Sequence, residues 1–229
     1  MGALTGEKLL RGWEAVRELP EQEAVLRLLA LAWPKRAENE WAQLPLGERN
    51  AMLLALRTAT LGRRMEGFAE CPACGALLEF VLDAGELEEQ LRAQLAAAEE
   101  SEQEMARPVN TADLIAASAA EDEEQARQIL LARTMKLDRR AAAGDGTLER
   151  FERMNRAGEI RIELACPECP AKPVLDLDVA QFLLREVAGA ARRLMREIHE
   201  LASVYGWSER AITAMSPVRR AAYLEMLSV

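Results

Sequence analysis

The chain has 229 residues, of which 29 are basic and 38 acidic, so its net charge at neutral pH is −9. Such a chain lacks the basic surface with which proteins bind nucleic-acid backbones, and no segment has the roughly 18 consecutive apolar residues that cross a membrane. Half of the residues are apolar but only 4% are aromatic. Because the apolar share is rich in alanine and leucine, we expect a mainly helical protein. No secretory signal pattern is visible, which predicts a protein of the reducing cytoplasm.

Residues 1–65 are predicted to form an N-terminal helical region. Apolar side chains recur at helical spacing over residues 4–19, and Thr5 is the expected N-cap of this helix. A second helix is predicted over 20–33, with one proline at its first turn and another directly after its end. A third helix is predicted over 45–61. The short connections between these helices favour antiparallel packing of neighbours.

Residues 66–85 and 159–179 are predicted to form the two halves of a small ribbon of strands. After Cys74, before Cys166 and after Cys169, apolar residues alternate with acidic or basic ones, which is the two-residue period of a strand. Only the segment that leads into the first cysteine pair shows weak alternation. Each cysteine pair is therefore predicted to lie at the tip of a pair of strands.

Residues 86–158, between the two halves of the ribbon, are predicted to be a helical insertion. Asn110 or Thr111 is the expected N-cap of one of its helices, because both side chains can accept a hydrogen bond from a backbone N–H. The acidic run over 99–104 is expected to be a solvated helix end or a loop. The insertion should not prevent the halves of the ribbon from meeting, because loop-closure entropy grows only slowly with length.

Residues 180–229 are predicted to form the C-terminal helices. A long helix from Val179 should end at Gly206, and Ser208 and Ser216 should cap two shorter helices. The predicted buried seam of the long helix is Leu183, Val187, Ala191, Leu194, Ile198 and Leu201. The side chains predicted to face solvent are Arg192, Arg193, Arg196 and Glu197. The predicted apolar side of the last helix consists of Tyr223, Met226 and Leu227.

Four cysteines stand in two C-x2-C pairs, each with a proline after its first cysteine. This spacing is typical of a tetrahedral zinc site, because two thiolates from one tight loop and two from another complete the coordination shell. The predicted ligands of a structural zinc ion are Cys71, Cys74, Cys166 and Cys169. Gly75 follows the first pair, where a positive φ angle is often needed, whereas Pro170 follows the second. A shell of four thiolates leaves no open position for a substrate.

Two alternatives for the cysteines are a redox dithiol or disulfide, and unrelated cysteines of the core. Redox C-x2-C motifs normally begin a helix, whose dipole lowers the pKa of the first thiol. Here strands are predicted after both pairs, which favours the metal site.

Residues for catalysis do not stand out in this sequence. It contains neither a glycine-rich phosphate loop nor a nucleophile elbow, and its single histidine, His199, is not part of a metal-binding motif. We expect His199 to pack between helices near Tyr205 or Trp207. The sequence therefore predicts a protein that is not an enzyme and has no small-molecule substrate.

The order of these elements resembles the baseplate protein family of contractile-tailed phages and related contractile injection systems. The resemblance covers nearly the whole chain: "LPLGERN" before a helix, "CPACG" and "CPECP" each beside a strand, and "NTADLIAA" leading to "QILLAR". Its most specific part lies in "REIHELASVYGWSERAITAMSPVRRAAYLEML", from Tyr205 to Leu224.

The resemblance implies a non-enzymatic baseplate or hub component, or a factor for its assembly. Its partners would be other baseplate or tail proteins, and it would be cytoplasmic or incorporated into a phage-tail or injection-system particle. An alternative is a zinc-ribbon adaptor of a transcription or other macromolecular complex. A nucleic-acid partner is not expected, because the predicted strands carry acidic residues such as Glu79, Glu163 and Asp176.

Overall fold

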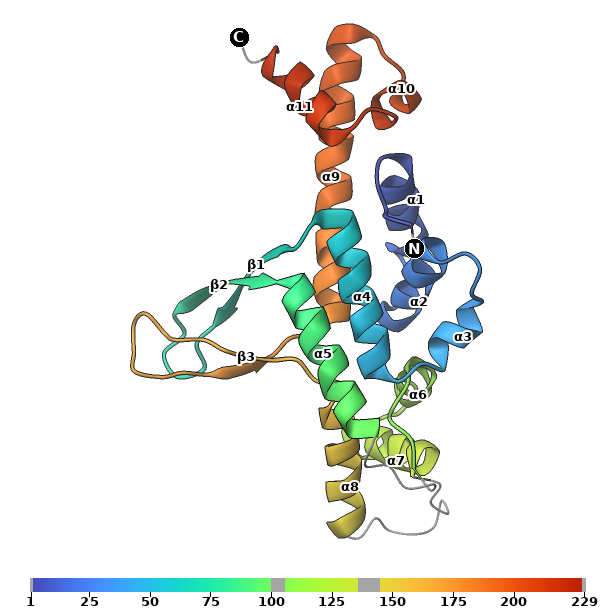
Figure 1. Cartoon of the computed structure of the whole chain (residues 1–229), viewed down its shortest axis with the longest axis vertical. Coiled ribbons are helices and arrows are strands. Elements are labelled where there is room, and N and C mark those ends of the chain that lie inside the picture. The colour runs from blue at the N-terminus through green and yellow to red at the C-terminus, as the bar shows by residue number, and fades with distance from the viewer. Residues whose placement is uncertain (1, 100–105, 136–144, 228–229) are drawn as a thin grey trace.

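A computed structural model describes residues 2–99, 106–135 and 145–227. Within these ranges the chain is mainly helical and has two small antiparallel sheets of two strands each, which confirms the predicted fold class. Figure 1 shows helices packed along one long C-terminal helix, with the strands projecting sideways from this helical body. The division of the chain into four regions stays a prediction.

The N-terminal region contains the three predicted helices and a fourth, shorter one. They are α1 (Glu7–Val16), α2 (Glu21–Ala32), α3 (Glu38–Ala42) and α4 (Leu46–Leu61). The prediction of Thr5 as N-cap is wrong, because α1 begins one residue later, after Gly6, and has no side-chain cap. Helix α3 was not predicted, since five residues are too few to show helical periodicity. Trp41 anchors it: the side chain is buried, and its ring lies 5.5 Å from that of Trp33.

Helix α9 (Val179–Tyr205) is the axis of the helical body, and α1, α2 and α4 all pack against it. Its buried side includes Leu183, Val187 and Leu194, as the apolar spacing predicts. Asp178 caps its first turn through the N–H of Gln181, and Gly206 ends it in a left-handed conformation. Burial of one continuous apolar stripe therefore sets the position of α9.

Two short helices, α10 (Glu209–Thr213) and α11 (Pro217–Glu225), fold back onto the C-terminal half of α9 with the predicted serine caps. One prediction made for this region is wrong. Glu197 does not simply face solvent, because its Oε2 accepts a hydrogen bond at 2.7 Å from the buried Arg220. Met226, on the predicted apolar side of the last helix, is 65% exposed.

The insertion contains α5 (Ala84–Glu99), α6 (Thr111–Ala117), α7 (Glu123–Thr134) and α8 (Asp145–Arg156). Helix α5 packs along α4 and buries Leu91 in the main core, so the first part of the insertion belongs to the helical body. Asn110 caps α6, as predicted, and shares a reciprocal capping box with Asp113. The predicted acidic run lies, from residue 100 on, outside the described residues.

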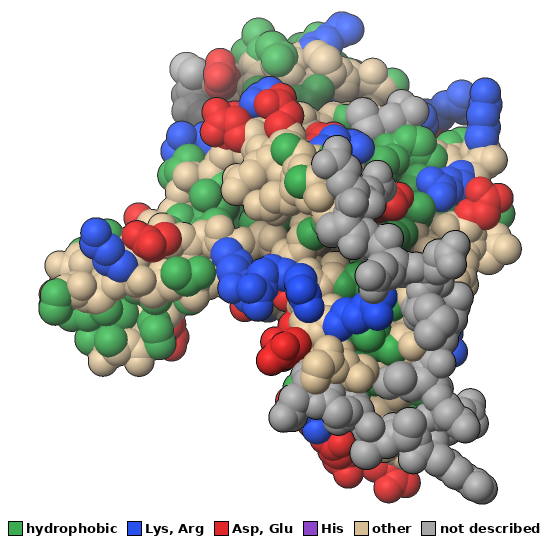
Figure 2. All heavy atoms as spheres, turned by 60° about the horizontal axis from the view of Figure 1, so that its bottom comes forward, with side chains coloured by type: hydrophobic (Ala, Val, Ile, Leu, Met, Phe, Trp, Pro, Cys, Tyr) green, Lys and Arg blue, Asp and Glu red, His purple; other side chains and the backbone are tan. Residues whose placement is uncertain are grey.

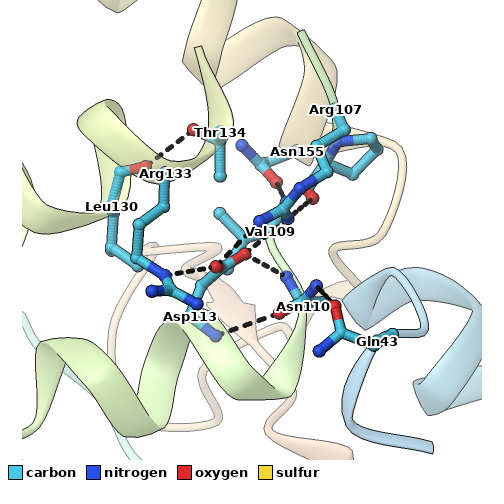
Figure 3. A network of polar contacts seen from close by, with 10 residues as sticks. Gln43, Arg107, Val109, Asn110, Asp113, Leu130, Arg133, Thr134 and Asn155 are labelled. Atoms are coloured by element: carbon cyan, nitrogen blue, oxygen red, sulfur yellow. Dashed lines mark hydrogen bonds and ion pairs between the residues drawn. The ribbon is translucent and has the colours of Figure 1, made fainter. Parts of the chain in front are cut away.

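Asp113 is the centre of the polar network that fastens α6 and α7 to the segment before them (Figure 3). The carboxylate is completely buried, and it accepts two hydrogen bonds from Arg107, one from Arg133 and one from the N–H of Asn110. Burial by itself raises the pKa of this carboxyl group, but the hydrogen bonds from the two arginines hold the pKa of Asp113 below its ordinary value. The ionised form of Asp113 therefore stabilises the fold.

The same segment is tied to the rest of the chain by backbone groups. The N–H of Val109 donates to Oδ1 of Asn155 on α8 at 2.8 Å, and its carbonyl accepts from the N–H of Leu46 at the start of α4. Helix α8 leads directly into the second half of the ribbon. These contacts therefore help to bring the second cysteine pair back towards the first.

We expect Asp113→Asn to destabilise the protein by about 2 kcal/mol at neutral pH, because the neutral amide loses the charge-assisted bonds to both arginines. Since the folded-state pKa of Asp113 is lowered, its stabilisation is present above the unfolded-state pKa of about 4 and is lost as the pH falls through the folded-state value. Urea unfolding between neutral and acidic pH measures this loss. Glu121→Gln, at an exposed carboxylate in the turn between α6 and α7, is the control. Equal acid sensitivity of Asp113→Asn and the unsubstituted chain would contradict the assignment.

Candidate metal centre

Two antiparallel pairs of strands carry the cysteine pairs at their tips, as predicted. Strand β1 (Arg64–Glu70) pairs with β2 (Leu77–Asp83), and β3 (Arg161–Glu163) pairs with β4 (Val174–Asp176). The strand before the first cysteine pair is fully paired, although its alternation is weak in the sequence. A side chain on Gly67 would meet the ring of Phe80 at 2.5 Å and that of Phe182 at 3.2 Å. The inner face of β1 therefore needs a glycine where a strand normally has an apolar residue.

Each cysteine pair lies in a tight loop closed by backbone hydrogen bonds. In the first loop, the N–H of Cys71 donates to the carbonyl of Ala76, and the N–H of Gly75 donates to the carbonyl of Cys71, both at 2.8 Å. Gly75 has φ of +75°, the positive value that its position predicts. In the second loop, the N–H of Cys166 donates to the carbonyl of Ala171 at 3.1 Å. The second loop thus closes without a glycine.

The four sulfur atoms form one compact cluster. The Sγ atoms of Cys71 and Cys169 are 3.8 Å apart, those of Cys74 and Cys166 are 3.6 Å apart, and all four lie within 4.8 Å of one another. Four sulfurs bound at about 2.3 Å to one tetrahedral ion would be about 3.8 Å apart. The cluster therefore fits a metal ion at its centre. None of the four cysteines is in a disulfide.

Two of the sulfur contacts, Cys71 with Cys169 and Cys74 with Cys166, join one loop to the other. A redox dithiol of the C-x2-C type would instead place together the two cysteines of a single loop, with the first at the start of a helix. Here strand β2 follows the first loop and β4 follows the second. The geometry favours a shared metal ion over two separate dithiols.

The thiols of the cluster alter one another's pKa values. Backbone N–H groups, first that of Ala73, lower the pKa of the Cys71 thiol to about 7. The N–H of Ala76 acts to lower the pKa of Cys74, but the neighbouring sulfurs, first that of Cys166, raise it to about 12. Without a cation, the thiol of Cys71 loses its proton easily, whereas the thiol of Cys74 keeps its proton. A metal ion removes this conflict, because it binds thiolates and displaces their protons.

Arg57, near the end of α4, fixes the base of the ribbon on the helical body. Its guanidinium group donates to both carboxylate oxygens of Glu186 on α9, at 2.7 and 2.9 Å, and to the backbone carbonyls of Gly62 and Arg64. The Arg57 side chain is only 4% exposed. One buried side chain thus joins α4, α9 and the first residue of β1.

Arg57 does not stand out in the sequence. An arginine within an amphipathic helix normally points to solvent, and only its place near the glycine that ends α4 could have drawn attention to it. For His199 the reverse holds: a residue predicted to be packed between helices lies at the surface. It is exposed on α9 rather than packed near Tyr205 or Trp207, so the prediction of a packing histidine is wrong.

Comparisons of the chain with protein-family models, with curated proteins and with solved structures find no match. Within residues 2–99, 106–135 and 145–227, no helix combines the length and apolar character needed to cross a membrane. The cysteine cluster is thus the feature from which a function can be argued.

Proposed function

We propose that this chain is a non-enzymatic structural or assembly component of the baseplate of a contractile phage tail or phage-like injection system, and that its four cysteines hold a structural zinc ion. The structural role is supported by the cluster of four sulfurs, in which Sγ atoms of the two loops lie 3.6 and 3.8 Å apart. Four protein ligands leave no coordination position for a substrate, so such a metal fastens the loops together instead of doing chemistry.

The metal is proposed to be zinc because of the ligand set. Four thiolates in tetrahedral arrangement suit zinc or iron, and zinc is the common structural ion of small ribbons. Protein purified without added metal should contain about one zinc ion per chain by elemental analysis. A zinc content near zero together with ready formation of disulfides would contradict the structural site and favour redox chemistry.

The aromatic side chains of the segment in which the resemblance is most specific pack against one another. The ring of Tyr205 stacks on that of Trp207 at 4.4 Å, and the ring of Tyr223 lies at 5.8 and 4.9 Å from these two. In the same C-terminal region, Val218 is 81% exposed and Met226 is 65% exposed, so both side chains are open to contact with another subunit.

The ribbon also has the character of an arm that touches other proteins. It projects from the helical body, and apolar side chains lie open on its surface (Figures 1 and 2). Phe68, Leu77 and Val81 are all more than half exposed on one face of the first hairpin, among acidic residues. A surface of apolar and acidic side chains supports a protein partner and does not favour nucleic acid.

Deletion of the gene from a host that makes the particle tests the baseplate role. We expect sheath and tube proteins to be made but complete tails to be absent in electron micrographs, because a tail does not assemble on an incomplete baseplate. Expression of the unsubstituted chain should restore tails, and expression of Cys166→Ser should not. Tails of normal number and form in the deletion strain would contradict the proposal.

A further inference from the structure

The first strand of the ribbon has one edge without a neighbouring strand. Strand β1 pairs only with β2. Beyond the two ends of this ladder, the N–H of Ala84 donates to the carbonyl of Arg63 and the N–H of Cys71 donates to that of Ala76. In an antiparallel pair, every second residue turns its N–H and C=O towards the partner strand. The odd-numbered residues of β1 are therefore those that bond to β2.

The even-numbered residues of β1 turn their backbone groups to the free edge. At this edge, the carbonyl of Arg64 accepts a hydrogen bond from the guanidinium group of Arg57. Glu66, Phe68 and Glu70 follow at alternate positions, and their N–H and C=O groups form no hydrogen bond with any other part of the described chain. Such an edge is a template for the backbone of a further strand.

A groove of about 800 Å³ opens along this edge. One wall is the backbone of β1, and the other walls are β4 and the first half of α9. Phe80, Leu175 and Phe182 are among the apolar residues that line it. Because strands in a sheet lie about 4.8 Å apart, an extended peptide beside β1 would enter this groove.

The acidic side chains along the groove already have partners. Glu66 pairs with Arg64, Glu186 with Arg57, and Asp176 with an arginine of β3 at 3.2 Å. A fourth acidic side chain, that of Asp178, caps the first turn of α9. The negative charge of the groove is thus largely compensated within the chain.

The basic side chains of the α9 wall are not compensated in this way. Arg185 and Arg193 line the groove and are exposed, and neither forms an ion pair with a carboxylate of the described residues. The guanidinium group of Arg193 lies over Gly189, within the groove. An occupant with acidic side chains on this side would pair with both arginines.

We propose that the free edge of β1 and this groove bind an extended segment of a partner protein as a third strand, with apolar and acidic side chains directed into the groove. A second copy of this chain is a poorer occupant, because antiparallel pairing of two β1 strands would place Glu66 and Glu70 of one copy against those of the other. This inference rests on the proposed structural role, because the added strand would be a segment of a neighbouring subunit.

The test uses the zinc-loaded full chain and the capped heptapeptide Glu-Thr-Val-Thr-Val-Thr-Glu, whose alternate side chains are acidic or apolar. Exchange of backbone amides in heavy water is followed by nuclear magnetic resonance. We expect the peptide to slow exchange at Glu66, Phe68 and Glu70 by at least about tenfold at saturation, because their N–H groups become hydrogen-bonded. The peptide with lysine in place of glutamate should bind several-fold more weakly.

Phe68→Pro removes one edge N–H without removing a hydrogen bond to β2, a position in a sheet where proline is tolerated. It should weaken peptide binding at least about tenfold, whereas Phe68→Thr, which keeps the N–H, should weaken it less. Arg185→Glu and Arg193→Glu together should also weaken binding. Arg192→Glu combined with Arg196→Glu makes the same charge change on exposed residues of α9 outside the groove, and it should leave binding unchanged.

Three results would overturn strand addition: no change at the three edge amides up to millimolar peptide, binding that Phe68→Pro leaves intact, or edge amides already protected in a dimer of this chain. Zinc content of the variants is measured in parallel. A variant that keeps its zinc but loses peptide binding supports the edge site. A variant that loses its zinc has a damaged metal centre, and its loss of peptide binding is then assigned to that damage. The gene-deletion experiment tests the baseplate role separately.

Discussion

Replacing Cys166 with serine is expected to abolish metal binding and to unfold the ribbon while the helical body keeps its fold. The sulfurs of Cys74 and Cys166 come from different loops and lie 3.6 Å apart, so loss of one ligand breaks the link between the loops. The free energy of binding a structural zinc ion is of the order of 10 kcal/mol or more. The second hairpin has only three residues in each strand, and a hairpin of that size is not stable alone in water.

Elemental analysis and nuclear magnetic resonance would measure this effect. The zinc content should fall from about one ion per chain to less than about one tenth, and the amide signals of β3 and β4 should collapse to unfolded positions. The helical circular dichroism should stay nearly unchanged, because α1, α2, α4 and α9 share their own core. Glu168→Ser, in the same loop but not a predicted ligand, is the control. Full zinc occupancy in Cys166→Ser would show that the two pairs do not share one ion.

Replacing Arg57 with methionine is expected to have the second largest effect, a loss of about 3 kcal/mol in the free energy of unfolding. Methionine keeps much of the volume but leaves the carboxylate of Glu186 without its partner and two backbone carbonyls without a donor. Removing one partner of a buried ion pair typically costs about 3–5 kcal/mol, and partial exposure of Glu186 lowers the estimate to the bottom of this range.

Chemical denaturation measures the stability of this variant, and amide exchange in β1 reports on the base of the ribbon. We expect faster exchange there even when zinc is still bound, because the ribbon loses its fixed attachment to α4 and α9. Arg63→Met is the matched control, since the ion pair of Arg63 with Asp83 is exposed and should contribute less than about 1 kcal/mol. Equal effects of the two substitutions would contradict the role of Arg57.

The cysteine cluster could be predicted because its signals are local. Two C-x2-C pairs at the ends of alternating apolar and polar segments are enough to indicate two loops that share an ion. Asn110 and the seam of α9 were equally predictable, since capping and helical periodicity depend on neighbours in sequence. In contrast, the first strand was obscured by Gly67, whose small size is required by the rings of Phe80 and Phe182.

Other features depend on residues that are distant in sequence. Arg57 and Glu186 are 129 positions apart, and neither stands in a pattern that distinguishes it from a solvated charge. The same is true of Glu197 with Arg220. A buried ion pair between helices becomes visible only when packing has placed the two helices side by side.

The helical class, the shared metal site of the two cysteine loops and the periodic face of α9 could all be predicted from the sequence, because they follow from local conformation and ligand chemistry. That Arg57 holds the ribbon on the body, and that the edge of β1 opens onto a groove, became visible in the folded chain alone. Each of these depends on how distant segments approach one another. That approach is set by the burial of the shared apolar core rather than by any local pattern.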